Sequence, residues 1–395
     1  MTARRRAGER GVARMQIDVL NGLAAVPPEE WNALVGDGSP FLEWGWLASL
    51  EESGCVSAQT GWLPQHLVLR DGARLIGACP LYVKSHSQGE FVFDHGWAEA
   101  AMRGGIAYYP KLLVAAPFTP ATGVRFLAHP AADRAAVVRT LGGAVQEICR
   151  RHGFSSAHVN FCLADEVAPL TALGFEERVG YQFQWLNPGW RTFDDYLDAF
   201  RSKRRTQIKR ELRELDAQGI AITVHRGDEI PAALVEPMFR LYTQTIDKLY
   251  WGRQYLNLTL FELLHRRWRE RLCFLVARRG DTIVAGTFNV RKHDVLYGRY
   301  WGAFEDLRYL HFNVCYYAAI DYCLREGITR FEPGAGGEFK HLRGFDARPT
   351  TSMHYLADPR LARAIRDYLT HERIAVAREI AWMAEQSAYK SRSDE

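Results

Sequence analysis

The sequence predicts an α/β (α+β) protein made of two tandem domains, each with a mixed central sheet flanked by helices. Its 395 residues suffice for two domains of about 150 residues each. Strand-like and helix-like patterns follow the same order in both halves, and two short segments recur. Residues 67–72 (LVLRDG) resemble residues 275–280 (LVARRG), and residues 149–153 (CRRHG) resemble residues 323–327 (CLREG). We therefore expect a duplicated α/β unit; two unrelated α/β domains with common hairpins are the alternative.

A hairpin and a long helix are the clearest signals in the first half. Aliphatic residues flank an Asp-Gly turn, which is typical of a hairpin over 66–70 and 75–83. Apolar residues recur at helical spacing over 133–151, and a glycine follows two residues later. The other expected elements are a strand at 16–20, helices at 29–34 and 44–53, apolar runs at 91–94 and 111–115, a strand at 157–161, a helix at 165–173 and a strand at 181–186.

The second half repeats this order after a join near residues 186–192. Thr192 is a helix-capping residue type, so we expect a helix from there to residue 200, followed by a basic helix that Gly219 closes. A Gly-Asp turn separates the strands of a second hairpin, at 273–277 and 282–290. The other expected elements are a strand at 220–224, helices at 231–250 and 258–271, a strand at 295–301, a helix at 311–325, strands at 329–332 and 350–355, and a long helix at 360–390.

The net charge of +4 is unevenly placed along the chain. Residues 1–14 hold five arginines and one acid, so the remaining residues sum to zero. We expect residues 1–15 to be a disordered leader, or a misassigned start before Met15; a basic arm for an acidic partner is the alternative. The domains are then expected at residues 16–188 and 189–358, with a C-terminal helix and polar tail at 359–395.

Several classes of protein are excluded by composition. The seven cysteines are widely spaced without a CxxC pair, which argues against a disulfide framework or a structural zinc site. The chain has no run of 18 apolar residues, and no apolar stretch follows the N-terminal arginines. A membrane-spanning helix and a secretory signal are therefore not expected, and the sequence predicts a reduced, cytoplasmic protein.

The order of elements, twice over, resembles the GNAT acyltransferase fold, and its duplicated form resembles the Fem-type transferases of bacteria. Residues 201–219 resemble the helix that opens the second Fem domain, and residues 300–302 with 331–340 resemble the closing pattern of that superfamily. More narrowly, the chain resembles the FemAB-like predicted N-acyltransferases of bacteria. The stretches that carry this resemblance are 39–46, 94–97, 117–120, 200–211 and 332–345. The resemblance implies two tandem GNAT-like acyl-CoA N-acyltransferase domains.

A glycine-rich loop after the strand at 329–332 is the strongest candidate site. Its glycines let the backbone approach a ligand and expose N–H groups. Acyl transfer to an amine needs a proton acceptor and donors for the developing oxyanion. The candidates are Glu332 and Glu338 as catalytic bases, Lys340 as the cation for a phosphate or carboxylate, and Gly334, Gly336 and Gly337 as the backbone cradle. The alternative is a surface loop in which the glutamates and the lysine pair with one another.

Residues 201–213 hold seven basic residues and one acid. Helical spacing spreads the charge around the first turns and leaves few acids at i+4 positions for pairing. The candidate anion-binding residues are Lys203, Arg204, Arg205 and Lys209, for a nucleotide, coenzyme A phosphates or tRNA. A solvated helix face is the alternative.

Further substrate-binding candidates lie in both halves. In the first half they are Asp94, His95, Trp97 and Thr119, as parts of an acceptor pocket. In the second half they are Arg299, Tyr300 and Trp301, as the lining of an interdomain cleft, and Asn313. The alternative for His95 is a structural histidine, for residues 299–301 a half-buried strand, and for Asn313 a helix-start asparagine.

The donor and acceptor stay open at this point. Residues 303–311 contain two acids and no glycine, whereas acetyl-CoA enzymes of the GNAT fold usually grip pyrophosphate with a glycine-rich turn there. We expect no tightly bound cofactor and no metal site; the donor is acyl-CoA or aminoacyl-tRNA, and the second agrees better with the missing turn. The predicted function is N-acyl transfer to a small-molecule or peptide amine, with peptidoglycan precursors implied by the resemblance. The alternative is a non-catalytic binder of RNA or an anionic metabolite through the basic helix.

Overall fold

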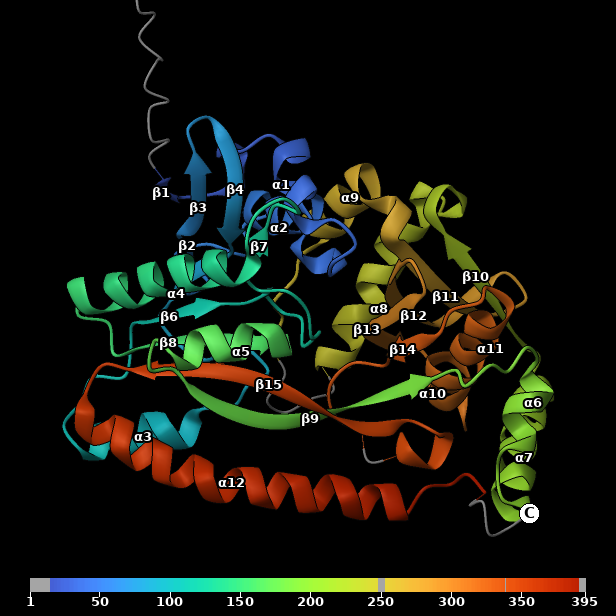
Figure 1. The fold of residues 1–395 in the computed structure, drawn as a ribbon. Coiled ribbons are helices and arrows are strands. Elements are labelled where there is room, and N and C mark those ends of the chain that lie inside the picture. The colour runs from blue at the N-terminus through green and yellow to red at the C-terminus, as the bar shows by residue number, and fades with distance from the viewer. Residues whose placement is uncertain (1–14, 248–252, 338, 391–395) are drawn as a thin grey trace, which may run out of the picture.

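The computed structural model describes residues 15–247, 253–337 and 339–390 (Figure 1). The strands are β1 (Met15–Leu20), β2 (Trp62–Pro64), β3 (His66–Asp71), β4 (Arg74–Cys79), β5 (Leu81–Lys84), β6 (Lys111–Val114), β7 (Leu127–Ala128), β8 (Ser156–Cys162), β9 (Glu176–Leu186), β10 (Ile220–Arg226), β11 (Leu272–Arg279), β12 (Thr282–Lys292), β13 (Val295–Ala303), β14 (Arg330–Glu332) and β15 (Asp346–Leu356). The helices are α1 (Pro28–Val35), α2 (Trp44–Glu52), α3 (His95–Arg103), α4 (Arg134–Arg151), α5 (Ala164–Thr171), α6 (Phe193–Asp198), α7 (Ser202–Asp216), α8 (Val235–Asp247), α9 (Leu258–Arg267), α10 (Leu310–Phe312), α11 (Ala318–Arg325) and α12 (Pro359–Glu385).

Side-chain caps set the starts of three of these helices. The carboxylate of Asp133 accepts a hydrogen bond from the third residue of α4. At the start of α6, Thr192 and Asp195 satisfy each other's main-chain N–H groups in a capping box. Asp358 caps α12, and Pro359 occupies its first turn, where no N–H partner is needed. Short polar side chains therefore fix where these helices begin, including the cap expected at Thr192.

An eleven-stranded sheet runs through both halves of the molecule in the order β10-β11-β12-β13-β14-β9-β15-β8-β6-β5-β2. Its parallel neighbours are β6 with β8 and β13 with β14, and the other neighbours are antiparallel. In each half a helical crossover joins the parallel pair, through α4 in the first half and through α10 and α11 in the second. A smaller sheet, β1-β3-β4-β7, completes the first half. The duplicated α/β plan expected from the sequence is therefore present.

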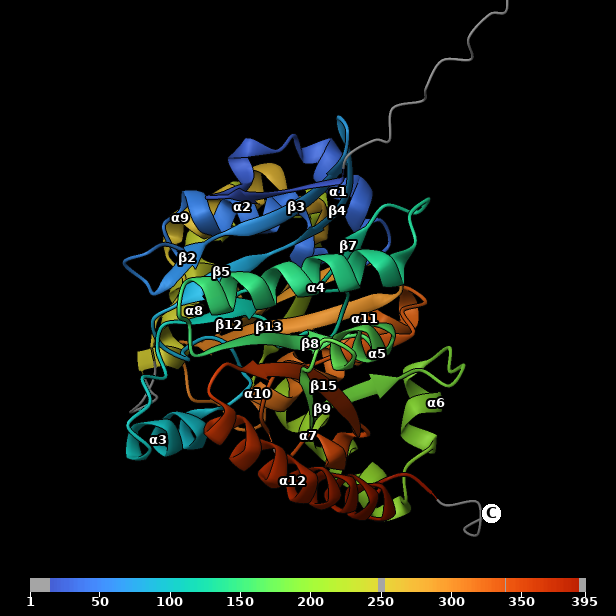
Figure 2. The ribbon, with the colours of Figure 1, turned by 60° about the vertical axis from the view of Figure 1, so that its left-hand side comes forward.

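The last strand crosses back into the first half. β15 pairs with β8 and along most of β9, although it follows β14 in the chain. β9 in turn pairs with β14 at residues 185 and 186, which joins the two parts of the large sheet. α12 then runs beneath β9 and β15 (Figures 1 and 2). The strand expected at 350–355 exists, but both of its neighbours in the large sheet, β8 and β9, belong to the first half.

The two halves share one apolar core. The Phe41 ring meets Tyr297 edge-on at a centroid distance of 5.2 Å. Trp46 on α2 lies 5.2 Å from Trp268, which follows α9. Burying these large rings removes apolar area from water on both sides of the contact, so the halves stabilise each other.

Several expected elements differ in extent. α3 occupies residues 95–103, beyond the apolar run expected at 91–94. A 3-10 turn over Ala232–Leu234 delays the start of α8, and residues 248–250 of the helix expected there lie outside the described residues. The long C-terminal helix ends at Glu385.

Candidate functional site

A cavity of about 670 Å³ opens where β13 and β14 part. The two strands pair only over residues 295–297 and 330–332. Beyond that point β13 continues along β12 to Ala303, whereas the chain leaves β14 as the loop 333–337. α8 and residues 311–316 close the opening between them. The diverging strands therefore create a ligand-sized space at the carboxyl end of β14.

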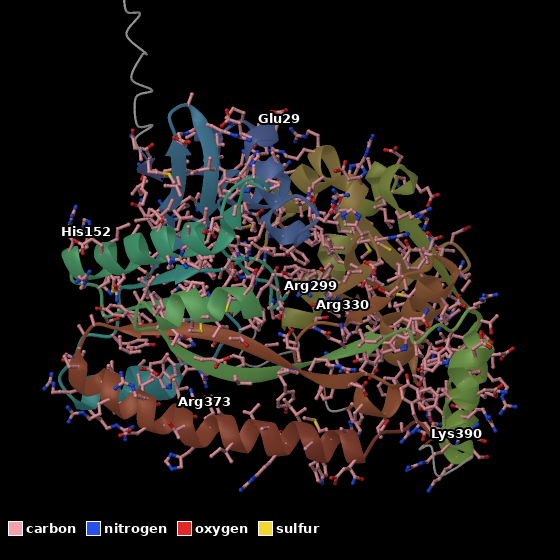
Figure 3. All side chains as sticks on the ribbon, viewed as in Figure 1. Glu29, His152, Arg299, Arg330, Arg373 and Lys390 are labelled. Atoms are coloured by element: carbon pink, nitrogen blue, oxygen red, sulfur yellow. The ribbon has the colours of Figure 1, made fainter. Side chains whose placement is uncertain are left out.

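The first half supplies one wall of this cavity. Its contribution is apolar and consists of Phe91, Phe93, Phe118 and Pro120. The Tyr300 hydroxyl donates to the main-chain oxygen of Phe118 at 3.3 Å, which ties β13 to that wall. Figure 3 shows Arg299 near the middle of the view, where the two halves meet. The predicted residues Arg299, Tyr300 and Trp301 all line the cavity.

Arg299 lies at a β-bulge. The register of β13 on β12 shifts between Gly298 and Tyr300, so Arg299 is the extra residue. Bulges re-aim side chains and are common beside active sites. The Arg299 guanidinium lies over the Phe41 ring, 5.0 Å from its centroid, and burial lowers its pKa. Within the described residues it has no hydrogen bond or ion pair, and its buried Nε has no acceptor.

The glycine-rich loop turns the chain so that Lys340 faces back into the cavity. Left-handed backbone occurs at the three predicted glycines, with φ of 85° at Gly334, 71° at Gly336 and 94° at Gly337. The Lys340 Nζ donates to the main-chain oxygens of Gly334 at 2.7 Å and Ala335 at 3.3 Å. Burial lowers the pKa of Lys340 to about 8, and the nearby charge of Arg299 acts in the same direction. Lys340 is therefore a buried ammonium that is held by the main-chain carbonyl groups of the glycine-rich loop.

His311 and Cys315 add two titratable groups to the lining. The His311 ring contacts Trp301 at a centroid distance of 4.8 Å and makes no hydrogen bond to the described residues. Burial, with the charges of Arg343 and Lys340, lowers the pKa of His311 to about 4, so its imidazole is neutral at pH 7. Burial raises the pKa of the Cys315 thiol well above its ordinary value, so it stays protonated.

The charge of the cavity is one-sided. Its described lining contains the cations Arg253, Arg299 and Lys340 and no aspartate or glutamate. Arg253 donates to the side-chain oxygen of Gln88, a neutral acceptor. Neither Arg299 nor Lys340 forms an ion pair with a described carboxylate. Because buried charges are normally paired, this lining is suited to an anionic or developing negative group.

Glu332, a predicted base, does not line this cavity. Successive side chains on a strand point to opposite faces, and here Phe331 faces the cavity while Glu332 faces a separate one. Burial raises the pKa of Glu332, against the lowering effect of Arg330, Arg299 and Arg125. The second predicted base, Glu338, lies outside the described residues.

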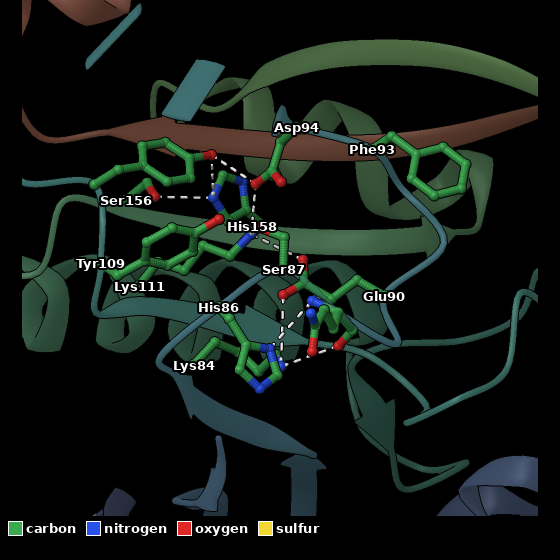
Figure 4. A network of polar contacts seen from close by, with 12 residues as sticks. Lys84, His86, Ser87, Glu90, Phe93, Asp94, Tyr109, Lys111, Ser156 and His158 are labelled. Carbon is green, nitrogen blue, oxygen red and sulfur yellow. Dashed lines mark hydrogen bonds and ion pairs between the residues drawn. The ribbon is translucent and has the colours of Figure 1, made fainter. Parts of the chain in front are cut away.

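Asp94 belongs to a buried network in the first half, which Figure 4 shows. Its carboxylate contacts the Lys111 ammonium and accepts a hydrogen bond from the Tyr108 hydroxyl at 2.6 Å. Burial alone would raise the pKa of Asp94, but the Lys111 charge holds it well below its ordinary value. Glu90 forms a second ion pair with Lys111 at 2.8 Å. Asp94 is therefore committed to internal pairing and does not line the large cavity.

The other first-half candidates also lie outside the cavity. His95 begins α3 on the surface, with its ring stacked on Phe93. Trp97 is buried and meets the His354 ring edge-on at 4.8 Å. Thr119 is buried with no partner for its hydroxyl, whereas its neighbours in the chain line the cavity. The predicted acceptor pocket around residues 94–97 is thus a packed structural region.

The basic helix α7 lies away from the cavity, on the outer side of the second half (Figure 1). Lys203 and Lys209 are exposed. Arg204 donates to Gln207, and Arg205 pairs with Asp198 at 3.0 Å. The four predicted anion-binding residues therefore form a separate surface.

Glu211 connects α7 to the cavity from behind. Its carboxylate pairs with Arg343 at 3.0 Å, three residues after Lys340, and both side chains are buried. Asn313 donates to the main-chain oxygens of Glu211 and Tyr309. Asn313 is buried, its side-chain nitrogen is occupied by these two contacts, and it does not line the large cavity. Glu211 and Asn313 instead hold the walls in place.

Sequence reasoning missed most of the residues that close the cavity. Arg253, Cys315, Tyr242 and Phe118 come from four separate segments, and no shared motif links them. His311 was visible only as the start of a helix. Thr287 and Asn289, buried on β12, alternate toward the cavity, but alternation alone does not distinguish a cavity wall from core.

The chain belongs to the FemAB-like family. Residues 22–391 match this family, which is described by peptidoglycan biosynthesis/recognition. A comparison with curated proteins finds no match. Within the described parts of the chain, no helix is both long and apolar enough to cross a membrane.

Solved structures share the fold at low sequence identity. FemX is similar with a TM-score of 0.53 and 13% identity, over 86% of this chain and 98% of its own. L-PGS from Bacillus licheniformis is similar with a TM-score of 0.54 and 9% identity, over 90% of this chain and 98% of its own. A tandem GNAT protein from the clavulanic acid biosynthesis pathway aligns over 88% of this chain and 99% of its own, with 12% identity and a TM-score of 0.46. The mixed α/β fold expected from the sequence is confirmed, and FemX and L-PGS share it over most of both chains.

Proposed function

We propose that the protein is an N-acyltransferase that moves an acyl or aminoacyl group onto an amine in the large cavity between its halves. One observation carries this proposal: the half-buried Arg299 and the buried Lys340 line the cavity, and neither forms an ion pair with a described carboxylate. Membership in a family described by peptidoglycan biosynthesis/recognition supports the reaction class. A peptide amine of a peptidoglycan precursor is the proposed acceptor, and an aminoacyl-tRNA or an acyl-CoA is the proposed donor.

The proposed chemistry is direct transfer. The neutral amine attacks the carbonyl carbon of the donor, a C–N bond forms, and negative charge gathers on the carbonyl oxygen. The C–O bond of an aminoacyl ester, or the C–S bond of a thioester, then breaks, and the leaving oxygen or sulfur takes up a proton. Arg299 and Lys340 are suited to stabilise the negative charge, because a preorganised cation in a buried site needs no reorganisation.

His311 is the proposed acceptor of the amine proton. Its imidazole is neutral at pH 7 and free of hydrogen bonds to the described residues. Cys315 is a poor nucleophile here because its buried thiol stays protonated. Holding donor and acceptor side by side adds a proximity effect, which can matter more than any single proton acceptor.

The test is a transfer assay with the full chain. The protein is incubated with alanyl-tRNA or acetyl-CoA and a UDP-linked muramoyl peptide, and mass spectrometry detects the acylated amine. We expect product with one donor, a fall of about 10²-fold in rate for His311→Asn, and full activity for the exposed control His95→Asn. Binding of these molecules without product would favour the non-catalytic alternative instead.

The donor can be identified from the basic helix. Lys203→Ala with Lys209→Ala removes two exposed charges that lie outside the cavity. If tRNA is the donor, transfer from alanyl-tRNA weakens and its salt dependence becomes shallower, because fewer phosphate contacts release counterions. Transfer from acetyl-CoA stays unchanged in the same variant.

A further inference from the structure

A second cavity, of about 370 Å³, lies on the opposite face of β14 from the large one. It is lined by residues 37–39 and 122–124 of the first half and by residues 292–295 of the second, together with Arg330 and Glu332. Its volume falls within the range of small-molecule sites. The cavity is therefore built by both halves and is separated from the proposed transfer site by the strand itself.

Buried polar atoms in this cavity lack partners within the described residues. Glu332 is only 3% exposed, and its Oε2 has no hydrogen bond. Its other oxygen lies 3.4 Å from the Nε of Arg330, which has no hydrogen bond either. The buried hydroxyl of Ser39 is also unpartnered. An unsatisfied buried carboxylate oxygen is costly, so a bound donor group would stabilise the folded protein.

The remaining charges around this cavity already have partners. Lys292 pairs with Glu43 at 2.9 Å, and His293 lies 3.3 Å from Asp37. Arg348, at the rim, pairs with Asp346 at 3.2 Å. Arg330 and Glu332 form an ion pair with each other at 3.4 Å, yet the Glu332 Oε2, the Arg330 Nε and the Ser39 hydroxyl are buried atoms without a hydrogen bond to the described residues. This combination fits a ligand that carries both a cationic nitrogen and an anionic oxygen.

We propose that the second cavity binds a small zwitterionic amine of amino-acid size. The ammonium donates to Glu332 and to the Ser39 hydroxyl, and the carboxylate of the ligand accepts from Arg330. This assignment gives Glu332 a binding role on the face of β14 to which its side chain points. It goes beyond the proposed transfer reaction and does not depend on it.

The experiment titrates the full chain with L-alanine and measures binding by ligand-observed NMR. Ethylamine carries only the ammonium and propionate only the carboxylate, so both are expected to bind at least tenfold more weakly than L-alanine. Glu332→Gln and Arg330→Gln are each expected to weaken L-alanine binding at least tenfold, with circular dichroism verifying the fold of each variant. Lys340→Met, in the other cavity, is the matched control and is expected to retain binding.

Several results would overturn the assignment. They are no binding of L-alanine to the unaltered protein, unchanged affinity in both Glu332→Gln and Arg330→Gln, and an affinity for ethylamine or propionate equal to that for L-alanine. A loss of L-alanine binding in Lys340→Met would also do so, because it would place the ligand in the large cavity. Absence of transfer activity would leave the expected binding intact, which keeps the two proposals distinguishable.

Discussion

Each half of the molecule buries a lysine beside its pair of parallel strands, but the two lysines have different surroundings. In the first half, Lys111 pairs with Glu90 at 2.8 Å and contacts Asp94 (Figure 4). In the second half, Lys340 donates only to two main-chain oxygens among the described residues. The same side chain is therefore neutralised in one half and left available in the other.

The pKa values follow this difference. Burial opposes the charge of Lys111, but the two carboxylates outweigh it and raise its pKa above the ordinary value. Burial of Lys340 has no such compensation and lowers its pKa to about 8. A paired buried charge is a structural feature, whereas an uncompensated one beside a cavity marks a candidate functional site. Burial also lowers the pKa of Lys84 in the first half, to about 7, but Lys84 lies 3.8 Å from Glu90 and outside the large cavity, whereas Lys340 lines it without an ion pair to a described residue.

The largest effect is expected from Lys111→Met. This change leaves Asp94 without its cation and leaves Glu90 only Lys84, 3.8 Å away. Breaking a buried pair costs about 3–5 kcal/mol. The free energy of unfolding, measured by urea denaturation, should fall by that amount. Lys209→Met on the exposed face of α7 is the control and should stay within about 0.5 kcal/mol. A loss below about 1 kcal/mol for Lys111→Met would mean that the first-half network is not held by this pairing.

Lys340→Met should have the opposite profile. Transfer is expected to slow by about 10²–10³-fold, the usual effect of losing one group that stabilises a developing anion. The free energy of unfolding should be unchanged or higher, because no described carboxylate loses its partner. Rates from the transfer assay and urea denaturation of the same preparation measure both quantities. A variant that unfolds more easily and still transfers normally would reverse the comparison.

Arg299→Met is expected to weaken binding of an anionic substrate by about 10–100-fold, the worth of a hydrogen bond to a charged group. The KM for the donor or the acceptor should rise accordingly, with little change in unfolding. Steady-state kinetics at two salt concentrations make the measurement. Arg360→Met, whose exposed side chain pairs with Asp358 at the start of α12, provides the control. Equal KM values in both variants would show that Arg299 does not bind the anionic substrate.

The smallest expected effect is a pH dependence in which folding stability and transfer rate change in opposite directions. The pKa of Lys340 is about 8 in the folded protein and 10.5 ordinarily, so the unfolded chain binds more protons between these values. The contribution of Lys340 to folding stability therefore rises with pH across that window. Transfer should instead decline above pH 8, as the ammonium is lost. Thermal unfolding measures the first trend and initial transfer rates measure the second. Both pH dependences should be absent in Lys340→Met.

The sequence predicted the order of elements well, because local patterns such as the Asp-Gly hairpin and the Thr192 cap do not depend on distant contacts. It did not predict that β15 returns to the first half, since pairing over 180 residues leaves no local signal. The sequence also did not predict the helix α3, because its local apolar pattern is weak. Its residues are mostly polar or small, and only Trp97 and Ala101 are buried.

The sequence predicted two contiguous parts of the candidate site: the glycine loop with Lys340, and residues 299–301, which line the same cavity. The glycine loop and Lys340 are contiguous in sequence, so their common role was visible. Glu332 adjoins them in the chain, but strand alternation turns it to the other face. Arg299 faces the cavity at a bulge, whose position depends on the register of β12 and β13. Arg253 and His311 come from separate segments that only the tertiary fold brings together.

The most direct test of the central claim is the change in melting temperature caused by donor molecules. Acetyl-CoA, alanyl-tRNA and a UDP-linked muramoyl peptide are added separately to the unaltered protein, to Lys340→Met and to the control Arg360→Met, whose side chain is exposed at the start of α12. A molecule that binds the folded state raises Tm. We predict that at least one of them raises Tm of the unaltered protein and of Arg360→Met but not of Lys340→Met. An equal rise in all three proteins would contradict the assignment of the large cavity as the transfer site.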